Sequence, residues 1–176
     1  MKIDFSEKNV LVTGGSGGIG KAICKAFSEA NANVAIHYNT NRSGAEDTLS
    51  SLSGNKHVIV QADLSKPDEV EEIIKCLPNV DIVVNNAAVV EQHNFDSLSY
   101  KQWQDIWKRT IESNLMGPAY LIYCASKVMR KKGGGKFVNI SSRGAFRGEP
   151  KAAAYGASKA GLNALGQSMA QALAKD

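Results

Sequence analysis

A tyrosine and a lysine four residues apart, with a serine upstream, are residue types that could together carry out acid–base chemistry. Tyr155 and Lys159 lie in an alanine-rich segment, and Ser142 precedes Tyr155 by thirteen residues. If that segment is a helix, the tyrosine and lysine side chains share one face. An ammonium about 4 Å from a phenol, at an effective dielectric of ~20, favours the phenolate by roughly 4 kcal/mol. The phenol could then exchange a proton near neutral pH, although the pair could also simply share an exposed helix face.

Strand-like apolar runs alternate with helical segments along the whole chain. The expected strands cover residues 9–13, 33–38, 56–61, 80–85 and 136–141. The expected helices cover 18–30 and 43–52, begin within 65–69, and then cover 99–130 and 152 to the end. This alternation predicts an α/β fold, a Rossmann-type doubly wound parallel sheet with strand order 3-2-1-4-5 and helices on both faces. We expect the 176 residues to form a single domain.

The first expected strand runs into a glycine-rich turn that opens a helix. Glycines let the backbone approach a pyrophosphate, and the helix N-terminus offers unpaired N–H groups. Two spacings fit, G-x-x-x-G-x-G beginning at Gly14 and G-x-G-x-x-G beginning at Gly15. A tight strand–helix turn without a ligand is the alternative. The cofactor-binding residues predicted in this turn are Thr13, Gly14, Ser16, Gly17, Gly18, Ile19 and Gly20.

The end of the second expected strand bears on which dinucleotide binds. An acidic residue there accepts the ribose 2′-hydroxyl of NAD and would repel a 2′-phosphate. Residues 37–42 contain no acid, and Arg42 adds a cation that suits a phosphate. We therefore expect NADP(H), with NAD(H) as the alternative, and contacts from Tyr38, Asn39 and Arg42. His37 is expected to pack at the strand end rather than to bind a ligand.

Composition and charge exclude several other classes of protein. Of the 176 residues, 43% are hydrophobic and 22% are charged, as in ordinary globular domains. The net charge of +4 is spread along the chain and makes no case for nucleic acid or a membrane surface as partner. Three cysteines far apart suggest reduced thiols in the cytoplasm rather than a disulfide framework or a metal site. Apolar runs stay well short of a membrane span of ~20 residues, and Met1 to Lys8 lacks a signal-peptide core.

The motifs in combination resemble those of the short-chain dehydrogenase/reductase family, and the chain is similar to its 3-oxoacyl carrier-protein reductases. The resemblance covers nearly the whole chain, and the motifs stand in the family's order and spacing. Ala88 departs from the glycine that the family most often has, and we expect its methyl group to be tolerated. The matching motifs are Thr13-Gly14-x-x-x-Gly18-x-Gly20, Asp63-Leu64, Asn85-Asn86-Ala87-Ala88, Asn114, Ser142 and Tyr155-x-x-x-Lys159.

The resemblance implies a role for each catalytic residue. Tyr155 would be the general acid or base, and Lys159 would make the phenol more acidic and hydrogen-bond the nicotinamide ribose. Ser142 would donate to the carbonyl oxygen of the substrate. Two alternatives stay open for this serine, because it could merely cap nearby backbone and because Ser141 is adjacent.

The resemblance also assigns the remaining cofactor contacts. Asp63 would accept from the adenine amino group, with the Leu64 backbone nearby. Asn86, Ala87 and Ala88 would lie under the adenosine ribose, and the segment would brace the sheet.

Asn114 stands out within the long expected helix because Pro118 follows it by four residues. Proline has no N–H, so the Asn114 carbonyl loses its helical partner. In the family the helix is distorted at this asparagine, whose carbonyl holds a water in a relay to the lysine; a proline kink without a role is the alternative. This helix often pairs with its copy in the family, so we expect a homo-oligomer.

The predicted function is that of an NAD(P)(H)-dependent oxidoreductase that interconverts a ketone or 3-oxoacyl group and a secondary alcohol, with a free or carrier-bound substrate. A dinucleotide-binding regulator without turnover and a non-enzymatic scaffold are the alternatives. Family members continue beyond the position of Asp176 with further strands and a substrate-covering loop. We therefore expect these 176 residues to be the first part of a longer protein, with slight activity alone.

Overall fold

The computed structural model describes residues 3–175 as a parallel sheet flanked by helices. The sheet has five strands in the order β3-β2-β1-β4-β5, which confirms the predicted order. Each strand lies inside its expected range and is the same length or a few residues shorter. Val10 in the central strand pairs with Val34 on one side and Ile82 on the other. The strands are β1 (Asn9–Val12), β2 (Asn33–Tyr38), β3 (Val58–Gln61), β4 (Ile82–Asn85) and β5 (Lys136–Asn139).

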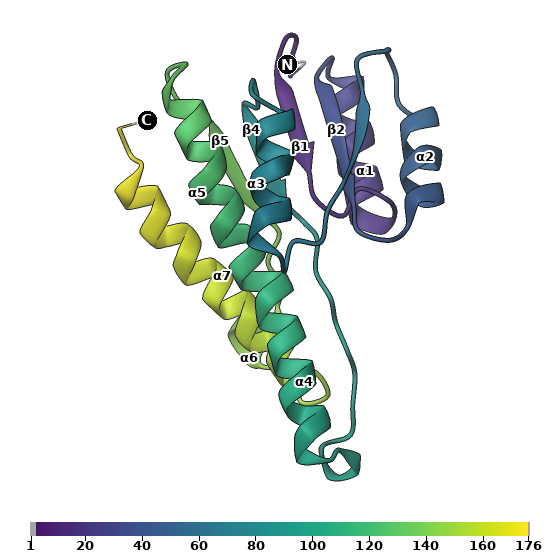
Figure 1. Ribbon diagram of the computed structural model, residues 1–176, viewed down its shortest axis with the longest axis vertical. Helices are drawn as coiled ribbons and strands as arrows, with labels where there is room; N and C mark the ends of the chain where they lie inside the picture. Colours follow the sequence, from purple (N-terminus) through teal and green to yellow (C-terminus); the bar gives the residue numbers. More distant parts are fainter. Residues whose placement is uncertain (1–2, 176) are drawn as a thin grey trace.

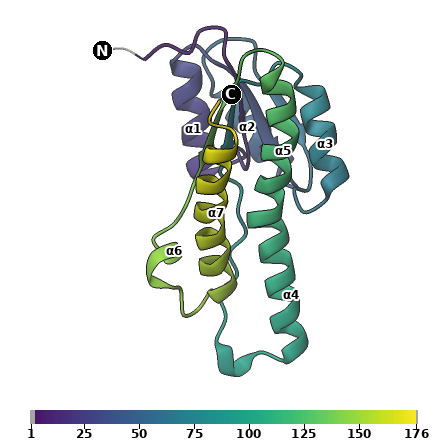
Figure 2. The same cartoon turned by 90° about the vertical axis from the view of Figure 1, so that its left-hand side faces the viewer.

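The helices follow the predicted alternation with three differences, the first of which is the short 3-10 helix η1 between β4 and α4. The long helix expected over residues 99–130 is divided by a π-helical turn, η2 (Glu112–Met116), and a short helix, α6 (Gly144–Arg147), follows β5. Figure 2 shows α1 on one face of the sheet and α3 and α5 on the other. Helix α2 packs in the same hydrophobic layer as α1, through Ala45. The helices are α1 (Gly18–Glu29), α2 (Arg42–Ser50), α3 (Pro67–Cys76), η1 (Phe95–Ser97), α4 (Tyr100–Ile111), α5 (Gly117–Arg130) and α7 (Ala153–Ala172).

The side chains of β1 alternate between the two hydrophobic layers, as the period of a strand requires. Val10 and Val12 pack in the layer that contains Cys24 of α1. Leu11 packs in the layer that contains Ile73 of α3 and Leu121 of α5. Because both faces of this strand are covered, its sequence is a continuous apolar run, which is the pattern of a buried parallel strand.

Local signals in the sequence account for where the helices start. Pro67 opens α3, with Asp68 and Glu69 in the first turn, where a fixed φ and negative charge favour a helix N-terminus. Ser99 and Gln102 form a reciprocal capping box at the start of α4. These signals place α3 and α4 close to their predicted starts.

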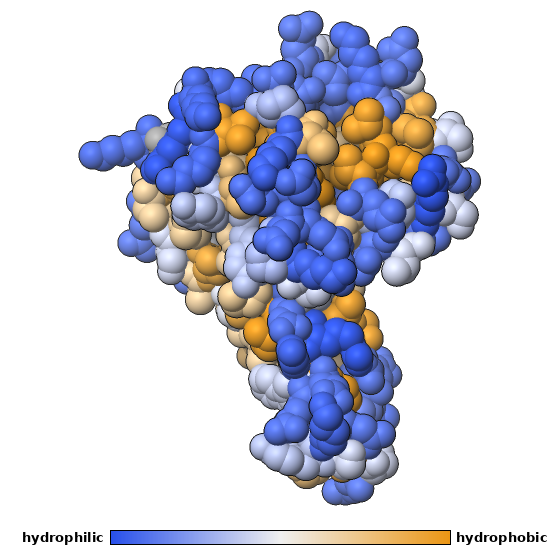
Figure 3. Space-filling view, in the orientation of Figure 1, coloured by the Kyte–Doolittle hydropathy of each residue, from blue (hydrophilic) through white to orange (hydrophobic). Residues whose placement is uncertain are grey.

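Helices α4, α6 and the first part of α7 project beyond the carboxyl ends of the strands (Figure 1). Helices α4 and α7 contact each other there. In Figure 3 the surface of this projecting part is mostly hydrophilic on the side shown, and larger hydrophobic areas lie on the sheet-bearing part. The glycine turn after β1 lies at the same end of the sheet, so the projecting part and the turn face one another across the strand ends.

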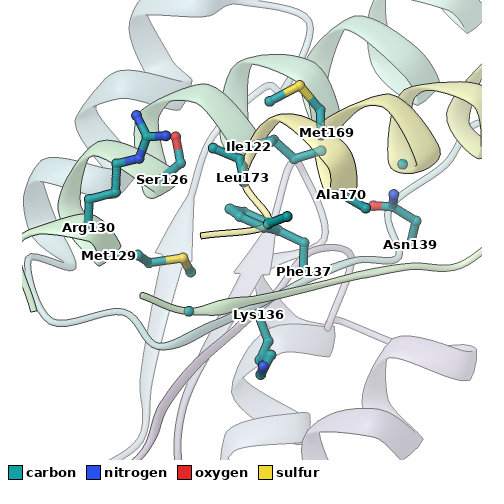
Figure 4. Close-up of a pocket in the computed structure, with 13 residues that line it drawn as sticks. Ile122, Ser126, Met129, Arg130, Lys136, Phe137, Asn139, Met169, Ala170 and Leu173 are labelled. Carbon is teal, nitrogen blue, oxygen red and sulfur yellow. The ribbon is translucent and has the colours of Figure 1, made fainter. Parts of the chain in front are cut away.

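Strand β5 is an edge of the sheet in the described residues, as predicted, and Val138 is 43% exposed. A hollow of about 400 Å³ lies over this edge between α5 and α7. Figure 4 shows Phe137 of β5 pointing into it, while Lys136 points the opposite way. None of the helices among residues 3–175 is long and apolar enough to cross a membrane.

Candidate active site

A cleft of about 490 Å³ at the carboxyl ends of the strands brings together the glycine turn and the Tyr155–Lys159 pair. Ligands of open α/β sheets bind at this end, outside the strand termini. Residues from the turn, from the ends of β2, β4 and β5, and from α7 form its wall. The predicted site residues that line the cleft are Gly14, Ser16, Gly17, Ile19, Asn39, Leu64, Asn86, Ala87, Ala88, Tyr155 and Lys159.

The backbone of the turn favours the glycine spacing that begins at Gly14. Gly14 has φ +65° and Gly18 has φ +51°, in the left-handed region where glycine avoids steric cost. A Cβ on Gly20 would lie 2.1 Å from the Gly14 carbonyl oxygen, so α1 packs directly on the turn there. A Cβ on Gly17 would meet no atom within 4 Å, because this residue faces the open cleft.

The turn is held from the β4 side by Thr13 and Asn86. The Thr13 hydroxyl donates to the Val84 carbonyl at 3.2 Å and accepts from the Asn86 and Ala87 amides at 2.9 and 3.0 Å. The Asn86 side-chain amide donates to the Thr13 carbonyl at 2.8 Å. Thr13 is therefore a brace under the turn, and the predicted bracing role of the segment after β4 is visible in these contacts.

Tyr155 and Lys159 share one face of α7, and the lysine is anchored beneath the cleft. Lys159 Nζ lies 5.8 Å from the centroid of the Tyr155 ring and donates to the Ile140 carbonyl at 2.7 Å. The lysine is 2% exposed, and burial lowers its pKa. The ammonium is thus fixed between the end of β5 and the tyrosine, which is half-buried at the cleft wall.

The two adjacent serines after β5 have different environments. Ser142 Oγ accepts from the Gly144 amide at 3.1 Å, at the start of α6. A hydroxyl that accepts one hydrogen bond can still donate its own proton, so this cap is compatible with donation to a substrate. Ser141 lines the cleft, and its buried Oγ has no hydrogen-bond partner among the described residues.

Asn114 lies in the π-helical turn and is fully buried. Its side chain pairs with the Val89 backbone twice, accepting from the amide and donating to the carbonyl, both at 2.8 Å. It also donates to Ser158 Oγ at 3.2 Å, one residue before Lys159. The predicted helix distortion at this asparagine is present, and the side chain ties the segment after β4 to α7.

Six of the predicted cofactor residues do not line the cleft, namely Thr13, Gly18 and Gly20 of the turn, together with Tyr38, Arg42 and Asp63. The Tyr38 side chain is 3% exposed, so its predicted contact with a cofactor is corrected to one that only its backbone could make. Arg42 is exposed at the start of α2, where its Nε donates to Glu46 Oε1 at 2.8 Å. Burial raises the pKa of Asp63, but hydrogen bonds from the Ser65 amide and hydroxyl outweigh it and hold that pKa below its usual range.

Comparison with known proteins places this fold and cleft in a family. Residues 8–176 match the short chain dehydrogenase family. The chain belongs to that family. In this short-chain dehydrogenase, residues of the glycine turn line the same cleft as Tyr155 and Lys159.

Curated relatives and solved structures agree with this assignment. A 3-oxoacyl-[acyl-carrier-protein] reductase of Synechocystis sp. is 32% identical, over 93% of this chain and 67% of the relative. An uncharacterized oxidoreductase of Thermotoga maritima is 34% identical, over 96% of this chain and 66% of the relative. This short-chain dehydrogenase therefore spans about two thirds of the length of these relatives.

Structural similarity extends over nearly the whole chain. A solved short chain dehydrogenase/reductase family protein is 30% identical with a TM-score of 0.86, covering 99% of this chain and 71% of that chain. A short chain dehydrogenase from Bacillus anthracis is 26% identical with a TM-score of 0.85, covering 94% of this chain and 70% of that chain.

Sequence reasoning missed part of the cleft wall of this short-chain dehydrogenase. His37 was expected only to pack, yet it also lines the cleft, as do Thr40 and Asn41 beside it. Position at the carboxyl end of β2 was the available signal for these residues. The other cleft residues without a sequence prediction are Val89, Val90, Ser113 and Ile140, and Ser141, considered only as an alternative to Ser142, also lines the cleft.

Proposed function

We propose that this short-chain dehydrogenase is an NAD(P)(H)-dependent oxidoreductase that interconverts a ketone or 3-oxoacyl group and a secondary alcohol. The observation that carries the proposal is that one cleft holds both a glycine turn and the Tyr155–Lys159 pair. The 3-oxoacyl-[acyl-carrier-protein] reductase named among its relatives supports the substrate class, free or carrier-bound. Pairing of two copies through α4 and α5 belongs to the proposal, and the molecular mass in solution tests it.

The residues of the turn fit a dinucleotide phosphate. Gly17 is exposed, faces the cleft and leaves open space where a Cβ would stand. The N-terminus of α1 follows immediately, with its unpaired N–H groups and the positive end of the helix dipole. An anion could therefore approach the backbone between Ser16 and Ile19 without a side chain in its way.

The chain's own residues would handle the proton. A bound nicotinamide dinucleotide supplies or accepts the hydride at the carbonyl carbon. Tyr155 would donate its proton to the carbonyl oxygen in reduction and take it back in oxidation. Ser142, held by the Gly144 amide, would donate to the same oxygen and fix its position.

The proposal predicts that Tyr155→Phe abolishes carbonyl reduction and leaves cofactor affinity within about twofold. The ring stays and only the proton donor is lost, so turnover should fall by at least ~10²-fold, the contribution of a general acid. NADPH oxidation with a 3-oxoacyl thioester, alongside fluorescence titration of NADPH, measures both quantities. Comparable turnover in the variant would refute the role of Tyr155. A wild type that binds NADPH tightly but lacks even the slight turnover expected of these 176 residues would indicate a dinucleotide-binding regulator instead.

We also infer a preference for NADP(H) over NAD(H). Asn39, Thr40 and Asn41 line the cleft after β2 without an acid among them, and Arg42 follows. The carboxylate of Glu46 forms an exposed ion pair with the guanidinium of Arg42. That carboxylate would compete with a 2′-phosphate for the cation.

A matched pair of variants tests this preference. Arg42→Ala should weaken NADPH several-fold and leave NADH unchanged, because only the former carries the 2′-phosphate. Glu46→Gln should strengthen NADPH, since it releases the guanidinium. Titration of both cofactors into the three proteins measures the ratio, and equal wild-type affinities for NADPH and NADH would contradict the inference.

A further inference from the structure

The imidazole of His37 is buried between the glycine turn and the end of β3. The side chain is 2% exposed. The Gly14 amide donates to Nδ1 at 3.1 Å, and Nε2 lies 3.0 Å from the Ala62 carbonyl oxygen. A backbone amide can only donate and a carbonyl can only accept, so these partners assign a neutral ring with the proton on Nε2.

His37 holds the turn by its backbone as well. The Gly15 amide donates to the His37 carbonyl at 2.8 Å, so two successive amides of the turn are bound to one residue. Asn86 binds the opposite side of the same turn through the Thr13 carbonyl. The turn is therefore hydrogen-bonded to residues of β2 on one side and to Asn86, after β4, on the other. On the β2 side these partners include the titratable imidazole of His37.

The surroundings of the ring keep it neutral. Burial lowers the pKa of His37 to about 4, against smaller opposing effects of the Ala62 carbonyl and the Asp63 carboxylate. Gly14, whose amide faces the ring, carries no charge, and Asp63 is the charged group that acts on the ring from the β3 side. Protonation of Nδ1 would place its N–H opposite the N–H of Gly14, so the hydrogen bond from the Gly14 amide would be lost.

We propose that the neutral imidazole of His37 is a positioning residue for the dinucleotide: by accepting the Gly14 amide, it fixes the glycine turn in the shape that leaves Ser16 and Gly17 facing the cleft. The inference rests on the proposed function, in which this turn binds the cofactor phosphate. Gly14 N–H is occupied by the ring, so the amides left for the phosphate are those further along the turn. His37 itself need not touch the cofactor.

Two substitutions separate this role from simple packing. His37→Phe keeps a ring of similar size and removes both the Nδ1 acceptor and the Nε2–H donor, and His37→Asn keeps an acceptor and a donor on a shorter side chain. We expect His37→Phe to weaken NADPH roughly tenfold, the effect of losing the one neutral hydrogen bond that the ring accepts from the Gly14 amide. His37→Asn should recover most of that affinity. In steady-state assays the KM for NADPH should rise in His37→Phe while kcat at saturating NADPH stays at the wild-type value.

A measurement on the wild type without cofactor covers the case in which His37→Phe does not fold. Long-range ¹⁵N NMR at pH 7 should show His37 as the neutral Nε2–H tautomer, and the Gly14 amide should exchange slowly with solvent. A protonated ring, the Nδ1–H tautomer or a fast-exchanging Gly14 amide overturns the proposal. A folded His37→Phe variant with unchanged NADPH affinity also overturns the proposal. In that case the proposed function still holds if the wild type binds NADPH and turns over substrate. A wild type that binds no dinucleotide overturns both.

Discussion

Two neighbouring serines differ in what their hydroxyl groups can do. Ser142 Oγ is oriented by the Gly144 amide, whereas the buried Ser141 Oγ has no partner among the described residues. We predict that Ser142→Ala lowers kcat by ~10²-fold or more, because an oriented donor to the reacting oxygen is lost. The reduction in kcat caused by Ser141→Ala should be at least tenfold smaller than that caused by Ser142→Ala, because Ser141→Ala removes an unpaired buried hydroxyl rather than a hydrogen bond.

Steady-state kinetics of both variants, with melting temperatures as a control for folding, decide between the serines. The reverse order of effects would move the catalytic assignment to Ser141, which stands on the cleft wall. Equal and small effects would leave Tyr155 as the sole donor to the carbonyl oxygen.

In the turn between β1 and α1, different glycines are required for different reasons. A Cβ on Gly20 would lie 2.1 Å from the Gly14 oxygen, so Gly20→Ala must push α1 away from the turn. We expect a loss of about 1–3 kcal/mol in the free energy of unfolding, as for other overpacked sites. Gly17→Ala should leave the free energy of unfolding unchanged, because φ is 172° and no atom lies within 4 Å of the position of the new Cβ. Its methyl group should nevertheless occupy the space through which the phosphate approaches the turn, and so weaken the binding of NADPH.

Urea unfolding and NADPH titration of the two variants test the element as a phosphate-binding turn. Unchanged NADPH affinity in a stably folded Gly17→Ala protein would contradict the approach between Ser16 and Ile19. A Gly20→Ala protein of wild-type stability would show that the contact between α1 and the turn relaxes without cost.

For the whole molecule, the buried His37 links stability to pH. The pKa of His37 is about 4 in the folded state and 6.5 in its ordinary state, so the folded protein favours the neutral ring. The unfolded chain binds a proton between these values and the folded chain does not, so stability rises with pH across that window. The contribution is complete above pH 6.5 and is lost as the pH falls toward 4, by roughly 3 kcal/mol in all.

Urea unfolding at pH 7 and pH 5 checks this dependence against His37→Asn, which lacks the ring. Hydrogen bonds lower the pKa of Asp63 and Asp81 despite burial, from an ordinary value of 3.8, so their contributions decline only in more acidic solution. The wild type should lose stability between pH 7 and 5, and the variant should lose less. The same pH dependence in both proteins would exclude His37 as its source.

The sequence alone determined the five strands and the approximate positions of the main helices. Apolar runs, Pro67 with its acidic neighbours, and the glycines after β1 act through neighbours within one or two turns of chain, so their outcome is readable locally. The placement of Tyr155 and Lys159 on one face of a helix is likewise readable from the local sequence, because it follows from their spacing of four residues. The order of the strands followed from the alternation and the family resemblance, and it is confirmed.

Only the tertiary structure decided which side chains face the cleft. Along a strand, neighbouring residues point to opposite faces, and both His37 and Tyr38 are buried. The His37 ring accepts from the Gly14 amide, whereas Tyr38, which was predicted to bind the cofactor, packs in the hydrophobic layer that contains Cys24 of α1. Thr13 and Asn86 meet across 73 residues of chain, and Asn114 meets Val89 across 25. Such partners are set by how the sheet and helices pack, because contacts between distant segments leave no periodic pattern in the sequence.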